Sequence, residues 1–375
     1  MKKKCILRER FNVIYQITGR KKDADNKARD ICFEQTVEFP QELLVPGFIR
    51  DNIVGKIVSF KQMGANSYTA VISYLTEITA GEFTQLLNVI FGNISMKPGI
   101  RVLRLELPKS MLSKFKGPRF GIIGLRKLLR VRKRPLLCTA LKPLGLKAEE
   151  LAELAYYFAL GGIDIIKDDH GLTNQCFARF KKRVALCAKA VAEANKKTGK
   201  KTIYVANITA PYDKILPRIR YAKHAGAGGI MIAPAIVGYD LMRTVAEDAK
   251  IKLPILAHPA LQGSYLLSPN FGISGYLIFG QLNRLAGADV TIYPNFGGRF
   301  KFTRQECREI IAGTQVEMEN IKPIFPCPAG GIGLKRVPGL LKFYGRDVIF
   351  LIGGGLIKHG KDLIENCRYF LELVK

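Results

Sequence analysis

Segments that would direct the chain into or across a membrane are missing from the sequence. The basic opening at residues 1–5 is followed by charged residues at positions 8–10, which interrupt any apolar run before it could serve as a signal peptide. The longest apolar stretch, residues 226–242, is rich in glycine and contains Pro234 and Asp240, so we expect a buried strand and loop there. These absences predict a cytoplasmic protein without a membrane partner.

Cysteine motifs are missing as well. The eight cysteines are scattered, with no C-x-x-C pair and no regular spacing. This pattern argues against a zinc site or a disulfide framework, and it predicts reduced, mostly buried thiols.

Acidic residues are scarce: Asp and Glu number 31 against 59 Lys and Arg, which gives a formal net charge of +28. Such a charge can indicate a nucleic-acid partner. The basic residues are spread along the chain rather than clustered with aromatic residues, however, which argues against nucleic acid. A positive field that steers a small phosphorylated substrate and a lysine-rich proteome both stay open as explanations.

What is present predicts two domains. A chain of 375 residues with 48% hydrophobic content can bury the cores of one large catalytic domain and one smaller domain. We expect the smaller domain at residues 1–134, as a repeated split β-α-β arrangement of the ferredoxin-like α+β type, ending in a basic connector at residues 114–134. Its predicted strands are residues 10–18, 53–62, 68–75 and 101–107, and its predicted helices are residues 24–35 and 81–91.

Short apolar runs recur from residue 135 onward, separated by helical segments. This alternation predicts a closed (β/α)8 TIM barrel over residues 135–375, because buried parallel strands read as nearly continuous apolar runs. A doubly wound open sheet is the alternative fold. The predicted strands are residues 135–142, 162–169, 202–209, 228–234, 254–259, 288–296, 323–331 and 348–355. The predicted helices are residues 147–160, 178–195, 217–225, 239–250, 275–286, 303–320 and 337–344.

Polar residues follow several of these predicted strands. Active sites of such barrels lie at the C-terminal ends of the strands, so these residues are candidates for a site. Three of the four histidines, His170, His258 and His359, fall at or just after strand ends. The other polar residues at these ends are Lys142, Lys167, Asp168, Asp169, Asn207, Asn295 and Arg299.

The run Lys167-Asp168-Asp169-His170 predicts a metal site. Alternate residues of an extended chain point the same way, which places Lys167 and Asp169 together. An ammonium group cannot bind a cation, so Lys167 must lose its proton or become a carbamate, whose oxygens suit Mg²⁺. His170 is a softer ligand and widens the choice to other divalent metals. A salt-bridged network at the barrel rim is the alternative interpretation.

Glycine turns follow the last two predicted strands, at Gly330-Gly331 and at Gly353-Gly354-Gly355. Such barrels often hold phosphate there, since backbone N–H groups can approach an anion closely at glycine. Plain turn geometry is the alternative. We expect Gly330, Gly331, Gly353 and Gly354, with Arg299, to bind the phosphate of a small substrate.

Lys142, Lys167 and His258 are the predicted catalytic residues. Lys142 could act as a general base if it loses its proton, or it could be a solvent-facing charge. His258 fits a proton shuttle and a hydrogen-bonded structural residue equally well.

Several motifs resemble one known family. Residues 161–169, Gly-Gly-Ile-Asp-Ile-Ile-Lys-Asp-Asp, resemble the G-G-x-D-x-x-K-D-D segment of the RuBisCO large-chain superfamily. Residues 115–122 are similar to its F-x-G-P-x-F-G-I element, and residues 328–332 to its S-G-G-I phosphate turn. The triglycine at residues 353–355 and Asn93 also fit family positions, so the matches run in order through nearly the whole chain.

The resemblance implies a role for each residue of the run. In the family, the lysine matching Lys167 is carbamylated by CO₂. It holds Mg²⁺ together with an aspartate matching Asp169 and a glutamate at the position of His170. The resemblance also implies a homodimer with composite sites, in which Glu34 and Asn93 reach the site from the neighbouring subunit.

Two departures from the family pattern argue against carbon fixation on ribulose bisphosphate. The loop after the sixth barrel strand, residues 293–300, lacks the K-x-E-G motif of the carboxylases. Pro259, just after His258, replaces an arginine that contacts a sugar phosphate in carboxylases. The chain is therefore most similar to the type IV, RuBisCO-like proteins.

Similarity to that group implies a metal-dependent lyase or isomerase that stabilises an enediolate of a phosphorylated keto-sugar or keto-sugar acid. Residues 141–143, 167–170 and 294–299 look most like enzymes of 3-oxo-isoapionate 4-phosphate, which act by decarboxylation or by transcarboxylation and hydrolysis. Methylthioribulose-1-phosphate isomerase and diketo-methylthiopentyl-1-phosphate enolase of methionine salvage are alternatives, although the enolase base corresponds here to Asn93. A basic nucleic-acid-associated protein is the alternative from a different class.

Overall fold

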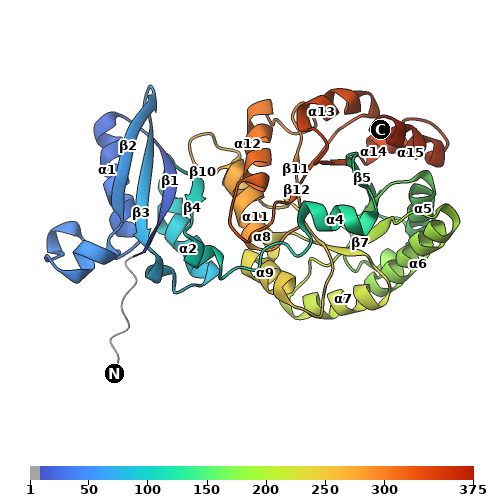
Figure 1. The fold of residues 1–375 in the computed structure, drawn as a ribbon, viewed down its shortest axis with the longest axis horizontal. Coiled ribbons are helices and arrows are strands. Elements are labelled where there is room, and N and C mark those ends of the chain that lie inside the picture. The colour runs from blue at the N-terminus through green and yellow to red at the C-terminus, as the bar shows by residue number, and fades with distance from the viewer. Residues whose placement is uncertain (1–8) are drawn as a thin grey trace. The chain divides into compact units, whose positions relative to one another are not determined.

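Residues 9–375 are described by the computed structural model, and they divide into two units (Figure 1). The first unit contains residues 9–115 together with Gln262–Leu282 and Met318–Ile321. The second contains Lys116–Leu261, Asn283–Glu317 and Lys322–Lys375. The domain boundary expected between residues 134 and 135 stays a prediction.

The first unit is built on a five-stranded sheet in the order β10-β4-β1-β3-β2. β1 pairs antiparallel with both β3 and β4, and the helices α1 (Lys21–Glu34) and α2 (Phe83–Phe91) follow β1 and β3. The strand order 4-1-3-2 with these two helices is the ferredoxin-like arrangement, so that prediction is confirmed. The strands are β1 (Arg10–Thr18), β2 (Lys56–Gly64), β3 (Ser67–Leu75), β4 (Ile100–Glu106) and β10 (Gly272–Ile273).

The fifth strand of this sheet comes from the segment between two barrel strands. β10 pairs in parallel with β4, and the Gln281 side chain bonds both backbone groups of Leu105, at 2.9 and 2.8 Å. The helix expected at residues 275–286 is a π-helix, Tyr276–Gln281, continued by α11 (Leu282–Leu285). Hydrogen bonds to β4 thus place this segment in the first unit, which the apolar pattern alone did not indicate.

The second unit is a parallel barrel in which the strands follow the order β5-β6-β7-β8-β9-β11-β12, with β13 beside β5. β13 pairs with β5 and also packs against β12, which closes the eight-stranded ring and confirms the predicted barrel. The strands are β5 (Leu136–Leu141), β6 (Ile165–Asp168), β7 (Ile203–Asn207), β8 (Gly229–Ile232), β9 (Ile255–Ala257), β11 (Val290–Pro294), β12 (Phe325–Ala329) and β13 (Ile349–Leu351).

Helices surround the barrel strands in Figure 1. The long helices α5 and α6 each end at a glycine with positive φ, Gly162 and Gly199, which terminates the helix without a Cβ clash. The helices of this unit are α4 (Gly121–Leu129), α5 (Ala148–Gly161), α6 (Phe180–Thr198), α7 (Tyr212–His224), α8 (Pro234–Val237), α9 (Tyr239–Glu247), α12 (Arg304–Gln315), α13 (Val337–Tyr344), α14 (Gly354–Ile357) and α15 (Leu363–Glu372). The first unit also contains α3 (Lys109–Leu112) and α10 (Gly263–Leu266).

The stretch expected as a connector, residues 114–134, contains helix α4. Leu125 and Leu129 of this helix pack in one apolar cluster with the buried faces of the barrel strands. Asp289, just before β11, fixes the start of α4, because its Oδ1 accepts hydrogen bonds from the N–H groups of Phe120 (2.7 Å) and Gly121 (2.8 Å). The helix therefore covers the N-terminal end of the barrel, and its basic residues masked the short apolar face in the sequence pattern.

Within residues 9–375 all the cysteines are free, and each is buried except Cys176. Cys5 lies outside the described residues. In the same range, no helix is both long and apolar enough to cross a bilayer.

Candidate active site

Two neighbouring strands bring the first polar residues together. Leu141 of β5 and Asp168 of β6 are partners in the parallel register. Lys142 and Asp169 each lie one residue further along, and their side chains meet in an ion pair at the C-terminal end of the barrel. Backbone pairing therefore accounts for an encounter between residues that are far apart in the sequence.

Asp169 is the centre of this cluster. Its Oδ2 lies 2.6 Å from Nζ of Lys142, and its Oδ1 lies 2.6 Å from Nδ1 of His170. Burial alone would raise the pKa of Asp169, but the hydrogen bonds from His170 and Lys142 and the charge of Lys167 together lower it well below its usual range. Asp169 is therefore an anion at neutral pH, with both oxygens engaged by groups that a cation can replace.

Lys167 points into the barrel from β6. The residue is 3% exposed, and its Nζ donates a hydrogen bond to the backbone oxygen of Asp168 at 2.9 Å. Burial lowers the pKa of the Lys167 amine, because the low-dielectric surroundings disfavour its charged form, while nearby Cys138 and Asp169 oppose that shift. The amine is thus closer to its neutral form than a lysine in water.

Asp168 faces away from the cluster into a closed network. Its Oδ2 lies 3.2 Å from Nη2 of Arg183 and accepts the backbone N–H of Asn207 at 3.0 Å, while its Oδ1 accepts the Tyr204 hydroxyl at 2.7 Å. Asp168 and Arg183 are both fully buried. This network joins β6, β7 and α6, and it leaves Asp168 with no oxygen for a ligand.

The two strand-end histidines, His170 and His258, stack with ring centroids 4.7 Å apart and planes 11° from parallel. Nδ1 of His258 accepts the backbone N–H of Ala260 at 3.2 Å. Burial, with the charges of Lys167 and His170, lowers the pKa of His258 to about 2. His258 is therefore neutral and carries its proton on Nε2, which makes it a hydrogen-bond donor.

Asn207 supports the loop that carries His170. Its Nδ2 donates to the backbone oxygens of His170 (2.8 Å) and Leu172 (3.0 Å). The residue is almost fully buried at the end of β7, so it fixes the path of the chain after Asp169. Its role is structural support for the cluster.

The glycine turn after β12 has the left-handed backbone that favours glycine, whereas the turn after β13 does not. Gly330 and Gly331 both have φ of +88°, and a Cβ on Gly331 would lie 2.8 Å from the backbone nitrogen of Arg299. A Cβ on Gly353 would lie 3.9 Å from the Lys142 side chain, so the turn after β13 adjoins the cluster. The side chain of Arg299 lies over the Phe300 ring at 5.0 Å.

Asn295, directly after β11, is fully buried. Its Oδ1 accepts the Tyr344 hydroxyl at 2.6 Å, whereas its Nδ2 has no hydrogen-bond partner among the described residues. A buried donor without a partner is uncommon and makes Asn295 a candidate for ligand contact. The sequence placed Asn295 among the polar strand-end candidates but gave it no specific role.

In the first unit, the expected substrate residues Glu34 and Asn93 contact each other. Nδ2 of Asn93 donates to Oε1 of Glu34 at 3.1 Å. Lys97, which sequence reasoning missed, lies 3.4 Å from Oε2 of Glu34 and 2.5 Å from Asp30. The structure therefore joins these two predicted residues into one polar group within their own unit.

Sequence reasoning also missed Arg183 and Tyr204. Arg183 follows Phe180 by three residues and precedes Cys187 by four on α6, and all three residues are buried. Helical periodicity could have identified Arg183 as an arginine on an apolar face, which requires an anionic partner. The sequence offers no comparable signal for the Tyr204 hydroxyl, because a tyrosine in a buried strand is ordinary.

The donor set is suited to a divalent cation only in part. Among residues 9–375, no three side chains of His, Cys, Asp or Glu converge as a metal site. Asp169 and His170 supply a carboxylate and an imidazole, and Lys167 can become a third ligand only after it loses its proton. The residues present therefore fit a cation if the buried amine of Lys167 is modified or neutral.

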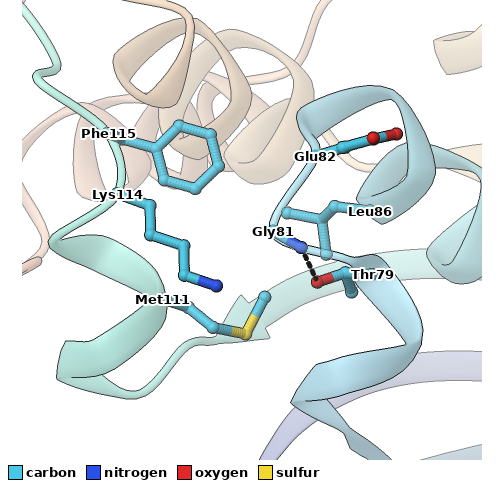
Figure 2. A pocket seen from close by; sticks show the side chains of 7 residues that line it. All are labelled: Thr79, Gly81, Glu82, Leu86, Met111, Lys114 and Phe115. Carbon is cyan, nitrogen blue, oxygen red and sulfur yellow. Dashed lines mark hydrogen bonds between the residues drawn. The ribbon is translucent and has the colours of Figure 1, made fainter.

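A separate cavity lies in the first unit and contains none of the predicted site residues. Figure 2 shows Lys114 and Phe115 facing Gly81 and Leu86 across it, with the Gly81 N–H bonded to the Thr79 hydroxyl at 3.3 Å. Its walls are mostly apolar, so it offers little to a phosphorylated ligand.

Comparison with known proteins gives a consistent result. Residues 121–364 match the family described as ribulose bisphosphate carboxylase large chain, catalytic domain. Ribulose bisphosphate carboxylase-like protein 1 of Rhodopseudomonas palustris is 38% identical over 96% of this chain and 96% of its own length. The 5-methylthioribulose-1-phosphate isomerase of Rhodospirillum rubrum is 35% identical over 98% and 96%. The 2,3-diketo-5-methylthiopentyl-1-phosphate enolase of Bacillus licheniformis is 34% identical over 94% and 88%.

Solved structures agree with these sequence relatives. The Rubisco-like protein from Rhodopseudomonas palustris superposes with a TM-score of 0.89 at 36% identity, covering 97% of both chains. A dimeric archaeal Rubisco from Hyperthermus butylicus gives a TM-score of 0.88 at 29% identity, covering 98% of this chain and 90% of its own.

Proposed function

Because this chain belongs to the ribulose bisphosphate carboxylase large-chain family, we propose that it is a RuBisCO-like enzyme that enolises a phosphorylated keto-sugar with the help of a divalent cation. The observation that carries this proposal is the Lys142–Asp169 ion pair beside buried Lys167, at the C-terminal end of the barrel. Two amines and one carboxylate therefore lie together at the end of the barrel where enzymes of this fold perform catalysis.

Lys167, Asp169 and His170 are the proposed cation ligands. Enzymes of the family generally use Mg²⁺ and a carbamylated lysine. Only a neutral amine reacts with CO₂, and the burial that lowers the pKa of Lys167 favours that form. A bound cation would draw electron density from the substrate carbonyl and stabilise the enediolate charge.

Lys142 is the proposed proton-transfer group. In the structure, Nζ of Lys142 lies 2.6 Å from Oδ2 of Asp169. A cation bound at Asp169 would release Nζ from this contact. After the ammonium group loses a proton to solvent, the neutral amine would take the proton from the carbon next to the carbonyl. The Nε2–H of His258 then donates a hydrogen bond to the oxygen on which negative charge develops.

The glycine turns are the proposed phosphate site. Positive φ at Gly330 and Gly331 and the open backbone at Gly353 and Gly354 allow main-chain N–H groups to face an anion without a Cβ. Arg299, beside Gly331 in the loop after β11, adds positive charge.

A homodimer is part of the proposal. One structural relative is described as a dimeric enzyme, and it covers 98% of this chain. We propose that Glu34 and Asn93, already bonded to each other, reach the partner's site, which gives two composite sites for each dimer.

The relatives favour enolisation or isomerisation as the reaction. Two of them are named for the isomerase and the enolase of methylthio-sugar phosphates, and the isomerase matches 98% of this chain. Decarboxylation or transcarboxylation of 3-oxo-isoapionate 4-phosphate stays a prediction, and none of the relatives reported above carries that name. Pro259 and the missing K-x-E-G motif argue against carboxylation of ribulose bisphosphate.

Deuterium exchange tests the proposal. The purified protein, with divalent cation and bicarbonate, is mixed in D₂O with 5-methylthioribulose 1-phosphate, the diketo phosphate or the oxo-isoapionate phosphate. We expect deuterium to appear next to the carbonyl, and we expect Lys167→Ala and Asp169→Ala to abolish it. Release of CO₂ without exchange would identify decarboxylation instead. Failure with every phosphorylated ketone, together with salt-sensitive RNA or DNA binding, would favour the nucleic-acid alternative.

A further inference from the structure

The loop after β11 packs backbone to backbone against the glycine turn after β12. The N–H of Arg299 donates a hydrogen bond to the oxygen of Gly330 at 2.8 Å, and the N–H of Asn295 donates one to the oxygen of Ala329, also at 2.8 Å. A Cβ on Gly298 would lie 2.2 Å from the oxygen of Gly330, so only glycine permits this approach. The loop and the turn therefore form one structure, and the proposed phosphate site lies on it.

Arg336, the last residue of the short 3-10 helix Leu334–Arg336, holds the loop through two adjacent carbonyl groups. Its Nη1 donates to the oxygen of Gly297 at 2.6 Å, and its Nη2 donates to the oxygen of Phe296 at 2.9 Å. The guanidinium group also lies over the Phe296 ring, 5.8 Å from its centre. One planar fork thus fixes two consecutive peptide units, and an ammonium group on a flexible stem does not reproduce that fork.

Gly297 permits this close contact. Its φ is +59°, in the left-handed region, and a Cβ there would lie 2.9 Å from Nη2 of Arg336. A side chain at this position would strain the backbone and displace the guanidinium group. The two successive glycines of the loop therefore serve two different contacts, Gly297 with Arg336 and Gly298 with Gly330.

The position of Arg299 depends on this packing. A Cβ on Gly330 would lie 3.0 Å from the Phe300 ring, and the guanidinium group of Arg299 lies 5.0 Å from the centre of the same ring. The backbone nitrogen of Arg299 lies 2.8 Å from the place of a Cβ on Gly331. Contacts that begin at Arg336 thus place the positive charge of Arg299 beside the glycine turn.

We infer that Arg336 is a positioning residue of the phosphate site, which holds the loop after β11 so that Arg299 and the Gly330-Gly331 turn face the substrate phosphate together. This inference rests on the proposed function and adds a residue to it. A loop that must become ordered on binding costs affinity, and a loop that is already held in place avoids that cost.

Inorganic phosphate, titrated into the purified protein in a calorimeter, tests the inference without turnover. Arg336→Lys keeps the positive charge but loses the fork, and Arg336→Met loses both, so the two variants separate position from charge. Arg308→Met is the matched control, because Arg308 lies over the neighbouring Phe343 ring at 5.4 Å. Hydrogen exchange of the loop peptide, followed by mass spectrometry, reports the bond from the Arg299 N–H.

We expect Arg336→Lys and Arg336→Met both to bind phosphate about tenfold more weakly than the wild type. Arg308→Met should stay within about twofold of the wild type, because solvent and salt screen an exposed charge. The Arg299 amide should exchange faster in both Arg336 variants, since its bond to Gly330 opens more often. With the phosphorylated substrate, KM should rise by a similar factor while kcat changes little, as expected when binding is weakened equally before and during the reaction.

Two results would overturn the inference and leave the proposed function standing. Phosphate binding by Arg336→Lys that equals the wild type would show that Arg336 acts through its charge alone. Unchanged exchange of the Arg299 amide in both variants would show that Arg336 does not hold the loop. A wild-type protein that neither binds phosphate nor enolises a phosphorylated ketone contradicts both the inference and the proposed function.

Discussion

Asp168 and Asp169 are adjacent in the sequence, yet their surroundings are opposite. Asp168 is sealed: Arg183, Tyr204 and the Asn207 backbone satisfy both of its oxygens inside the protein. The carboxylate of Asp169 faces the end of the barrel, where its two oxygens contact the side chains of Lys142 and His170.

The difference follows from the pleat of β6. Successive side chains of a strand point to opposite faces, so one aspartate turns toward α6 and the next toward the strand-end cluster. The sealed carboxylate stabilises the fold, and the open one is available for chemistry. Substitutions should therefore affect stability at the first and cation binding or catalysis at the second.

The largest expected effect on the free energy of unfolding comes from replacing Arg183, the buried partner of Asp168. Arg183→Met leaves the Asp168 carboxylate buried without its cation, which should cost about 3–5 kcal/mol of unfolding free energy. Urea denaturation of the purified protein measures this loss. Lys189→Met, on the exposed face of the same helix, is the matched control and should stay within about 0.5 kcal/mol of wild type. Equal effects of the two substitutions would contradict a sealed Asp168–Arg183 pair.

Lys142→Met removes a partner of Asp169. We expect this substitution to have a small effect on stability and a large effect on turnover. The Lys142 side chain is 38% exposed, so its ion pair with Asp169 should contribute only about 0–1 kcal/mol to stability. Turnover should fall about 10²–10⁴-fold because the proton-transfer group is lost.

Cation binding gives a second readout for the same variant. Because Lys142 competes for Oδ2 of Asp169, divalent cations should bind Lys142→Met more tightly than the wild type. Isothermal titration with the cation and an exchange assay in D₂O separate the two effects. Weaker cation binding in the variant would show that Lys142 does not occupy the place of the cation.

A further prediction concerns Gly331, in the glycine turn that we propose as part of the phosphate site. Gly331→Ala places a Cβ 2.8 Å from the Arg299 nitrogen at a φ of +88°, which should cost about 1–2 kcal/mol in stability. If the turn binds phosphate, KM should rise more than kcat falls. Gly333→Ala is the control, since a Cβ there meets nothing within 4 Å. A Gly331→Ala enzyme with unchanged KM would assign this glycine to turn geometry alone.

The sequence predicted the eight barrel strands and the polar strand ends because buried parallel strands and their terminal charges leave local signals. It did not predict that α4 covers the barrel end or that β10 joins the other sheet, since both depend on contacts with distant segments. Alternation along the extended chain predicted that Lys167 and Asp169 point the same way, but it did not predict that Asp168 would pair with the buried Arg183. The His170–His258 stack could not be foreseen, because it joins two separate loops.

The smallest expected effect is the pH dependence that Asp169 adds to stability. The folded protein holds the pKa of Asp169 below its usual value of 3.8, so the carboxylate stabilises the fold above that pH and loses this effect progressively below it. At neutral pH the contribution should be below about 1 kcal/mol, because solvent screens the partly exposed Lys142 and His170. Asp169→Asn should therefore differ most from wild type at neutral pH and converge with it in acid. Denaturant titrations at several pH values measure the difference, with the exposed Asp51→Asn as the control. A difference that grows as the pH falls would mean that Asp169 is not held as an anion, and its contrast with Asp168 would then lose its electrostatic basis.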